Sequence, residues 1–218
     1  MSETRDPLTL VTPIGSLSVL FVMATNQEYG PALRRLIDPL ITGVGPVEAA
    51  VVTGAALGAL AERKRLPDLV FSLGSAGSRT LDHAAIYQIA NVTYRDMDAT
   101  PLGFAKGVTP FLGELAVIPI PHRIPGMPSA SISTGGAIIS GGGYDGIAAD
   151  MVDMESYAVL RAAQRFGVSM VGLRGISDGR SELTKLPDWT DTLHDIDAKL
   201  AAAVEAFKMH VESGSFRL

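Results

Sequence analysis

Two carboxylates, Glu155 and Asp178, lie beside successive apolar, strand-like runs of the chain. In α/β folds a strand delivers side chains into a crevice at its C-terminal end, where such folds bind their ligands. The spacing therefore predicts a site for a polar small molecule. One carboxylate would bind hydroxyl groups, and the other would transfer a proton.

Three more polar residues fit the same pattern. Glu28 and Ser75 each lie just after another apolar run, and Arg174 ends the run that Asp178 follows. If the strands are parallel, their C-terminal ends share one edge of a sheet and all five side chains can converge. Any one acidic residue could instead be a helix cap or a solvated loop residue, and the choice depends on strand order.

Such a set of residues could cleave an N-glycosidic bond. That bond breaks through an oxocarbenium-like state, as in other glycosides. A partly protonated, buried Asp can supply the proton that a leaving purine needs. A carboxylate near the ribose can bind its hydroxyls, and a second carboxylate can orient and deprotonate water.

The elements expected to position these residues alternate between strands and helices. The predicted strands span 16–23, 68–73, 86–94, 114–120, 129–134 and 168–173, with a short one at 152. The predicted helices span 28–37, a long Ala-rich stretch from about 46 to 65, the residues before Phe166, and Trp189–Val211. This order predicts an α/β fold with a mixed central sheet flanked by helices, in one domain over residues 1–218.

Composition excludes several classes of protein. The 218 residues carry a net charge of −5 and no long basic run, which disfavours nucleic acid as a partner. There is no cysteine, and the four histidines lack metal-ligand spacing, so we expect no metal and no cofactor. No apolar run reaches membrane-spanning length, and the polar segment Met1–Pro7 lacks a signal-peptide core. We therefore expect no membrane association and a cytoplasmic location.

Several segments together resemble one family. In chain order they are residues 24–28 (ATNQE), 42–45 (TGVG), 74–77 (GSAG), 94–100 (YRDMDAT), 152–155 (VDME) and 174–178 (RGISD). In this order and spacing the chain resembles the 5′-methylthioadenosine/S-adenosylhomocysteine nucleosidases of the purine nucleoside phosphorylase superfamily. The Gly43-Val-Gly45 turn alone also resembles the start of a dinucleotide fingerprint, but the third glycine is missing.

The resemblance implies a role for each matching residue. Glu28 would be the base that activates water, with Ser75 and Arg174 helping to hold that water. Glu155 would bind the ribose hydroxyls, and Met154 would pack against the sugar. Asp178 would protonate the purine. The resemblance implies a small-molecule nucleoside as substrate.

The chain also departs from the family pattern. Few residues separate the first helix from Thr42, and the stretch 114–133 is short and Pro-rich, which implies a trimmed version of the fold. In the base-contacting segment 134–139, Gly136 replaces the usual Asp, and Ile138, followed by Ile139, replaces a purine-stacking Phe. Base selectivity therefore stays open, and hydrolysis of another purine nucleoside such as futalosine is an alternative.

The nucleophile site favours water over phosphate. Phosphorylases of the superfamily carry a Gly- and Arg-containing loop after the first strand, whereas residues 24–28 contain neither and end in Glu28. Two like charges ~4 Å apart repel by roughly 4 kcal/mol at an effective dielectric near 20. We therefore predict a nucleosidase. A purine nucleoside phosphorylase and a nucleoside-binding protein without catalysis are the alternatives.

Four apolar residues complete the predicted site. By resemblance, the loop that carries Ala99, Leu102 and Phe104 would approach the active site of a neighbouring subunit, which predicts a homodimer. These side chains could instead pack onto their own subunit. Trp189 would either anchor the last helix in the core or line the substrate pocket.

Overall fold

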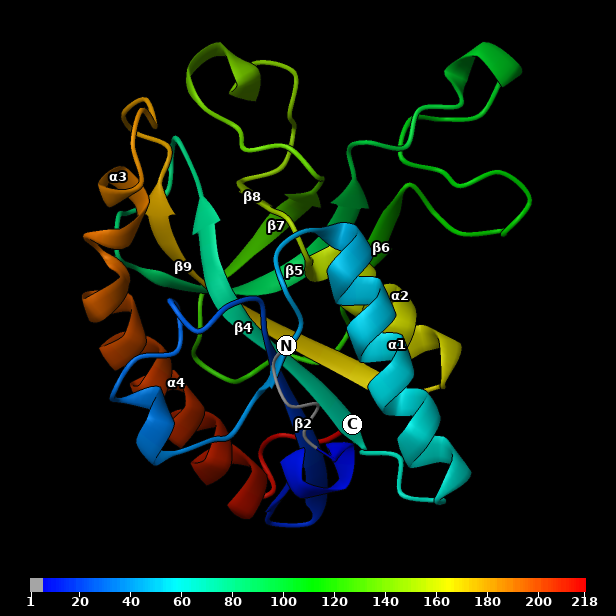
Figure 1. The fold of residues 1–218 in the computed structure, drawn as a ribbon, viewed down its shortest axis with the longest axis vertical. Coiled ribbons are helices and arrows are strands. Elements are labelled where there is room, and N and C mark those ends of the chain that lie inside the picture. The colour runs from blue at the N-terminus through cyan, green and yellow to red at the C-terminus, as the bar shows by residue number, and fades with distance from the viewer. Residues whose placement is uncertain (1–5) are drawn as a thin grey trace.

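The computed structural model describes residues 6–218, in which strands are interspersed with helices along the chain (Figure 1). The strands are β1 Val11–Ile14, β2 Leu17–Met23, β3 Leu40–Ile41, β4 Leu69–Gly77, β5 Ile86–Tyr94, β6 Val117–Pro119, β7 Ser129–Thr134, β8 Met151–Asp153 and β9 Ser169–Asp178. The α-helices are α1 Pro46–Glu62, α2 Ser156–Arg165, α3 Pro187–Thr190 and α4 Leu193–Glu212. Short 3-10 helices are η1 Pro7–Leu10, η2 Leu33–Arg35, η3 Thr100–Leu102 and η4 Gly141–Tyr144.

The sheet is mixed, and part of it closes on itself. β2, β4 and β9 are parallel neighbours, so their C-terminal ends meet at one edge. β9 also pairs antiparallel with β5, β5 pairs parallel with β7, and β7 pairs parallel with β8. β8 returns to β4 through the single antiparallel pair of Gly77 and Val152. This closure brings the end of β8, and the residues that follow it, beside the C-terminal end of β4.

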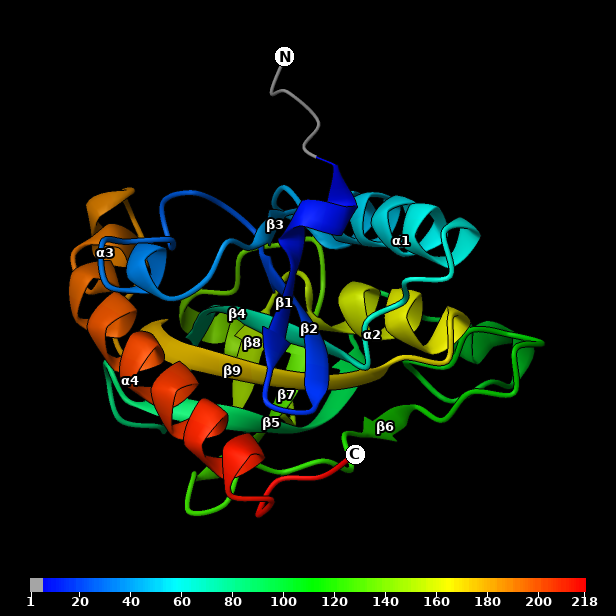
Figure 2. The same ribbon diagram turned by 90° about the horizontal axis from the view of Figure 1, so that it is seen from below.

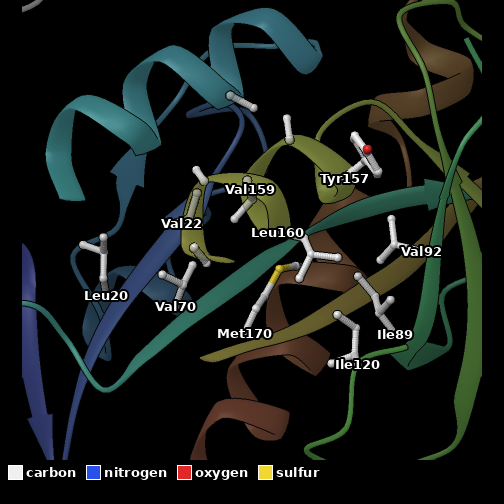
Figure 3. Close-up of a cluster of buried hydrophobic side chains, with 14 of the residues drawn as sticks. Leu20, Val22, Val70, Ile89, Val92, Ile120, Tyr157, Val159, Leu160 and Met170 are labelled. Atoms are coloured by element: carbon white, nitrogen blue, oxygen red, sulfur yellow. The ribbon is translucent and has the colours of Figure 1, made fainter. Parts of the chain in front are cut away.

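Helices cover both faces of the sheet. Figure 2 shows α1 and α2 on one side and α4 on the other. Because side chains alternate along a strand, β2 sends Leu20 and Val22 towards α1 and α2 and sends Phe21 towards α4. Figure 3 shows the first of these two cores, with Leu160 of α2 among the side chains. The predicted α/β architecture with a mixed central sheet flanked by helices is therefore confirmed.

Several predicted boundaries are wrong. The helix expected over 28–37 is only the single 3-10 turn η2, because Asp197 of α4 accepts hydrogen bonds from the backbone N–H groups of Ala32 and Leu33 and fixes a turn there. The strand expected over 114–120 shrinks to β6. The C-terminal helix does not begin at Trp189, which lies in the separate short α3, and α4 begins at Leu193.

Among the described residues, 6–218, no helix combines the length and the apolar character needed to cross a bilayer. Most of the polar N-terminal stretch considered above, residues 1–5, lies outside the described residues.

Candidate active site

Glu28 lies in the segment after β2 and is buried beside β4. Its Oε1 accepts a hydrogen bond from the Ser75 backbone N–H at 2.7 Å and another from the Ser75 hydroxyl at 2.6 Å. Its Oε2 is buried and has no hydrogen-bond partner within residues 6–218. Burial raises the pKa of Glu28 above its ordinary value, and the Ser75 hydrogen bonds oppose that rise. A carboxyl group with a raised pKa is a stronger base when ionised.

A small cavity of about 10 Å³ lies against Glu28. That volume holds about one water molecule. Residues from β4, β9 and the segments after β2 and β8 line it, and among them are Glu28, Ser75, Glu155 and Arg174. Polar groups therefore surround a space in which one water can be held next to the unpartnered Glu28 oxygen.

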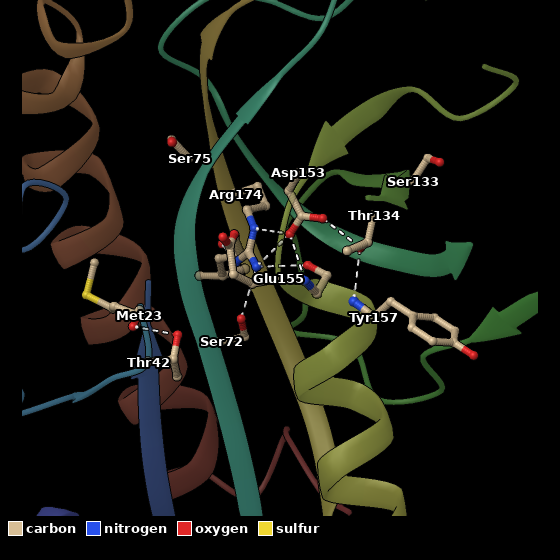
Figure 4. A network of polar contacts seen from close by, with 12 residues as sticks. Met23, Thr42, Ser72, Ser75, Ser133, Thr134, Asp153, Glu155, Tyr157 and Arg174 are labelled. Atoms are coloured by element: carbon tan, nitrogen blue, oxygen red, sulfur yellow. Dashed lines mark hydrogen bonds and ion pairs between the residues drawn. The ribbon is translucent and has the colours of Figure 1, made fainter. Parts of the chain in front are cut away.

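Arg174 lies in the middle of β9 and is almost completely buried. Its guanidinium forms a salt bridge with Asp153 at 3.0 Å, with the two side chains 2% and 1% exposed. It also donates to the hydroxyls of Ser72 and Ser156, and Asp153 accepts a further hydrogen bond from Thr134 (Figure 4). Arg174 thus joins β4, β9 and the start of α2, and its charge is already neutralised by Asp153.

Glu155 lies two residues after the end of β8 and directly precedes α2. Its Oε1 accepts a hydrogen bond of 2.7 Å from the backbone N–H of Gly45, which opens α1. Burial, and after it the negative charge of Asp153, raises the pKa of Glu155 to about 7. One oxygen is held by the backbone, so the other can meet a ligand.

Asp178 is the last residue of β9. Its Oδ2 accepts a hydrogen bond of 2.7 Å from the Ser177 hydroxyl. Burial raises the pKa of Asp178, while the Ser177 hydrogen bond and the nearby His83 lower it. A carboxyl group in this setting holds a proton more readily than an exposed one, as a general acid requires.

A second, larger cavity of about 500 Å³ adjoins the small one and shares Ala24, Glu28, Ser75 and Glu155 with it. This volume falls within the usual range for small-molecule sites. Asp178 lies on its wall, as do Met154 and Trp189. The indole N–H of Trp189 donates to the Ser75 hydroxyl at 3.0 Å, so Trp189 lines the pocket rather than only anchoring a helix. The arrangement places one candidate base, one candidate acid and a third carboxyl around one nucleoside-sized space.

Comparison with known proteins identifies the family. The model of the phosphorylase superfamily matches residues 142–209. A 5′-methylthioadenosine/S-adenosylhomocysteine nucleosidase of Haemophilus influenzae (strain PittEE) is 33% identical over 159 aligned residues, which cover 64% of this chain and 67% of that protein. The chain belongs to the 5′-methylthioadenosine/S-adenosylhomocysteine nucleosidase family. The family membership predicted from the sequence segments is therefore confirmed.

Solved structures support the same fold for this nucleosidase-family chain. The Campylobacter jejuni 5′-methylthioadenosine/S-adenosylhomocysteine nucleosidase superposes with a TM-score of 0.72 at 16% identity, covering 91% of this chain and 100% of that one. A futalosine hydrolase of Helicobacter pylori superposes with a TM-score of 0.67 at 17% identity, covering 90% and 97%. At these identities the likeness shows a shared nucleoside phosphorylase-like fold.

Most of the residues predicted for the nucleosidase site lie together. The large cavity is lined by Glu28, Ser75, Ile138, Ile139, Met154, Glu155, Asp178 and Trp189. Arg174 lines the small cavity instead. The prediction that polar residues follow their strands is wrong in detail, because Ser75 and Arg174 lie inside β4 and β9 and Asp178 ends β9.

The structure does not bring the predicted loop residues to the cavity of their own chain. Ala99, Leu102 and Phe104 line neither cavity. Leu102 is 75% exposed, whereas Phe104 packs edge-on against Phe111 of the same loop, with ring centroids 5.6 Å apart. Phe104 thus packs within its own subunit, and Leu102 has no such cover.

Sequence reasoning missed some residues of the site. Asp153 was not singled out, although it stands two residues before Glu155 in the same short segment. The stretch 183–186 lines the large cavity but carries no motif. Tyr144, whose hydroxyl lies beside the cavity-lining Gly77, also gave no sequence signal, since it follows three glycines that indicate only a flexible turn.

Proposed function

We propose that this protein hydrolyses the N-glycosidic bond of purine nucleosides of the 5′-methylthioadenosine and S-adenosylhomocysteine type, releasing the free base and the 5-thioribose. One observation carries the proposal. The buried carboxyl of Glu28 has an unpartnered oxygen and borders a one-water cavity that adjoins a nucleoside-sized one. Glu28 in its ionised form would take a proton from that water as the water attacks the anomeric carbon.

Water suits this site better than phosphate. The small cavity of about 10 Å³ has no room for a phosphate ion. Arg174, the cation among its lining residues, is already paired with Asp153. An ionised Glu28 would also repel an anion at ~4 Å by roughly 4 kcal/mol. These three features favour hydrolysis over the phosphorylase alternative.

Asp178 and Glu155 would act on the leaving base and on the ribose, respectively. Asp178, whose pKa is raised by burial, would in its protonated form give a proton to a ring nitrogen of the leaving purine. Glu155, held by the Gly45 N–H, would bind the ribose hydroxyls through its free oxygen. Met154 would pack against the sugar, and Ile138 would lie against the base.

The test is a substrate panel with product identification. Methylthioadenosine, S-adenosylhomocysteine, adenosine, inosine and futalosine are incubated with the protein, with and without phosphate. We expect methylthioadenosine and S-adenosylhomocysteine to give free base and a reducing sugar, at a rate independent of phosphate. Glu28→Gln should abolish turnover while substrate binding, measured by calorimetry, persists.

The possible outcomes distinguish the alternatives. Strict dependence on phosphate with a sugar 1-phosphate as product would replace the hydrolase by a phosphorylase. A preference for futalosine would keep the hydrolysis but change the substrate. Binding without cleavage of any nucleoside would leave only the nucleoside-binding alternative.

We also propose a homodimer. The loop between β5 and β6 projects from the body on the same side as α1 (Figure 1). Leu102 and Phe111 of this loop are 75% and 93% exposed, and Val47 and Val51 of α1 are exposed too. Burying apolar side chains of this size stabilises an interface by roughly 1.5–3 kcal/mol each. The exposed loop would then approach the active site of the partner and cover the 5′ group of its substrate.

Sedimentation tests the dimer. Wild type should sediment as a dimer at micromolar concentration, and Leu102→Asp should shift it towards monomer with loss of turnover on methylthioadenosine. The matched control is Leu66→Asp, an exposed leucine after α1, which should leave both properties unchanged. A wild-type monomer with full activity would rule out a shared site.

The assignment of residues 1–218 to one domain and the cytoplasmic location stay predictions.

A further inference from the structure

The hydroxyl of Tyr144 is buried without a partner. Tyr144 ends the 3-10 helix η4 and is 8% exposed. Its Oη forms no hydrogen bond with any group in residues 6–218. Buried hydroxyls are nearly always paired, because an unpaired one has lost its contact with water without replacement. An unpaired hydroxyl in this position therefore calls for an explanation.

Tyr144 Oη lies near the free oxygen of Asp178, although the two form no hydrogen bond. A Cβ placed on Gly77 would lie 2.5 Å from Asp178 Oδ1 and closer still to Tyr144 Oη, so the two oxygens flank one point beside the backbone of β4. Only glycine leaves them this space. Asp178 Oδ2 already accepts from Ser177, so Oδ1 is the oxygen left for proton transfer.

The surroundings keep Tyr144 protonated. Burial, and after it the charge of Asp178, raises the pKa of Tyr144 to about 12, opposed by Arg79 and Arg95. The Arg79 guanidinium lies over the phenol ring at 5.4 Å from its centroid and is itself paired with Asp145. Tyr144 is therefore a hydrogen-bond donor at any pH at which the enzyme works.

We propose that Tyr144 is a positioning residue for the acid step, whose hydroxyl donates to Asp178 Oδ1 as that oxygen gives up its proton. This inference rests on the proposed function. In that step the proton moves from Asp178 to a ring nitrogen of the purine, and the electron pair of the glycosidic C–N bond leaves with the base. The negative charge that remains on Asp178 then has the Tyr144 hydroxyl beside it, and a small movement of the carboxyl brings the two groups into hydrogen-bond contact, which stabilises the ionised form.

Tyr144→Phe tests the role by removing only the hydroxyl. The ring and its contact with Arg79 remain. We expect kcat on methylthioadenosine to fall by about 10- to 100-fold, the range for one hydrogen bond to a charged group, with little change in KM. With 4-nitrophenyl 5-methylthioriboside, whose leaving group departs without a proton, we expect less than about a threefold loss.

The pH profile provides a second readout. Asp178 acts in its protonated form, so activity falls as pH rises through its pKa. Without the Tyr144 donor the carboxylate is less stable, its pKa rises, and this basic limb moves to higher pH. The other ionisable groups around the pair are His83, Arg79 and Arg95, all of which Tyr144→Phe leaves in place.

A third readout does not depend on turnover. Carbon-13 titration of the Asp178 carboxyl should show a higher pKa in Tyr144→Phe than in wild type. This separates the inference from the proposed function, because it can be read even if no nucleoside is cleaved. An unchanged Asp178 titration, or an equal loss of kcat on both substrates, would overturn the role of Tyr144.

Tyr157→Phe is the matched control. Tyr157 of α2 is as buried as Tyr144 and stacks on Tyr94, and its hydroxyl points away from the polar network around Arg174 (Figure 4). We expect neither the kcat ratio between the two substrates nor the Asp178 titration to change. A shift equal to that of Tyr144→Phe would mean that the effect is structural and would also overturn the proposal.

Discussion

Replacing Glu155 by Gln should make the protein more stable at high pH while it weakens substrate binding. Burial raises the pKa of Glu155 from 4.5 to about 7 in the folded protein. Between these values the folded state holds a proton that the unfolded state releases, so the free energy of unfolding falls as pH rises through this window. A gap of this size corresponds to about 3 kcal/mol once Glu155 is fully ionised. Because one side of Glu155 faces the cavity, solvent reduces the effect, and we expect about 1–3 kcal/mol.

Glu155→Gln keeps the shape of the side chain and an oxygen for the Gly45 N–H, but it cannot ionise. The variant should therefore match wild type near pH 4 and exceed it by about 1–3 kcal/mol above pH ~8. For a domain of this size that is a rise of about 2–12 °C in Tm. Thermal unfolding followed by circular dichroism at several pH values measures it, and turnover assays on the same samples should show the loss of ribose binding as a raised KM.

Glu62→Gln is the control for the loss of one carboxyl, because Glu62 is exposed at the end of α1. It should leave the pH dependence of Tm unchanged. If Tm of wild type and Glu155→Gln fell in parallel with rising pH, the raised pKa of Glu155 would be wrong. A variant less stable than wild type at high pH would show that the ionised form is stabilised in the fold, against the burial argument.

Three further predictions follow from the same contacts. Asp178→Asn should reduce kcat on methylthioadenosine by ~10²–10⁴-fold, the range for one acid–base group, and a near-normal rate would remove Asp178 from the mechanism. Asp153→Ala should lower the free energy of unfolding in urea titrations by about 3–5 kcal/mol, because it leaves the buried Arg174 without its counter-charge; a loss under about 1 kcal/mol would contradict this. Trp189→Phe should lower kcat by only about two- to tenfold, since it removes one neutral hydrogen bond to Ser75, and a complete loss would show a larger role.

The strands with continuous apolar runs could be predicted from sequence alone. The apolar run 16–23 became β2 at Leu17–Met23, and the more polar stretch 129–134, in which Ala130 and Ile132 alternate with serines, became β7 with the predicted bounds. Local pattern suffices for such strands because every second side chain enters one of the two cores. The segments that resemble the family likewise predicted where Glu28, Glu155 and Asp178 lie. Each of these residues is at or near the end of a strand whose position the hydrophobic pattern predicts.

Features that depend on distant contacts could not be predicted. The turn after Glu28 replaces a helix because Asp197, far along the chain, caps its backbone N–H groups. The salt bridge between Arg174 and Asp153 depends on the pairing of β8 with β4. A single residue pair, Gly77 with Val152, joins these two strands. No local signal fixes these contacts, which form only when the sheet closes.

The carboxyl groups of Glu28, Glu155 and Asp178 would have different roles because each accepts hydrogen bonds from different donors. Burial raises the pKa of each, so ionising all three together is costly. Glu28 accepts two hydrogen bonds from Ser75, which favour its carboxylate form, as a base for water requires. Within the described residues 6–218, Asp178 accepts one side-chain hydrogen bond, from Ser177, so fewer donors favour its carboxylate form. Different hydrogen-bond environments can assign acid and base to neighbouring carboxyls of one site, and within residues 6–218 Glu28 has two donors where Asp178 has one side-chain donor.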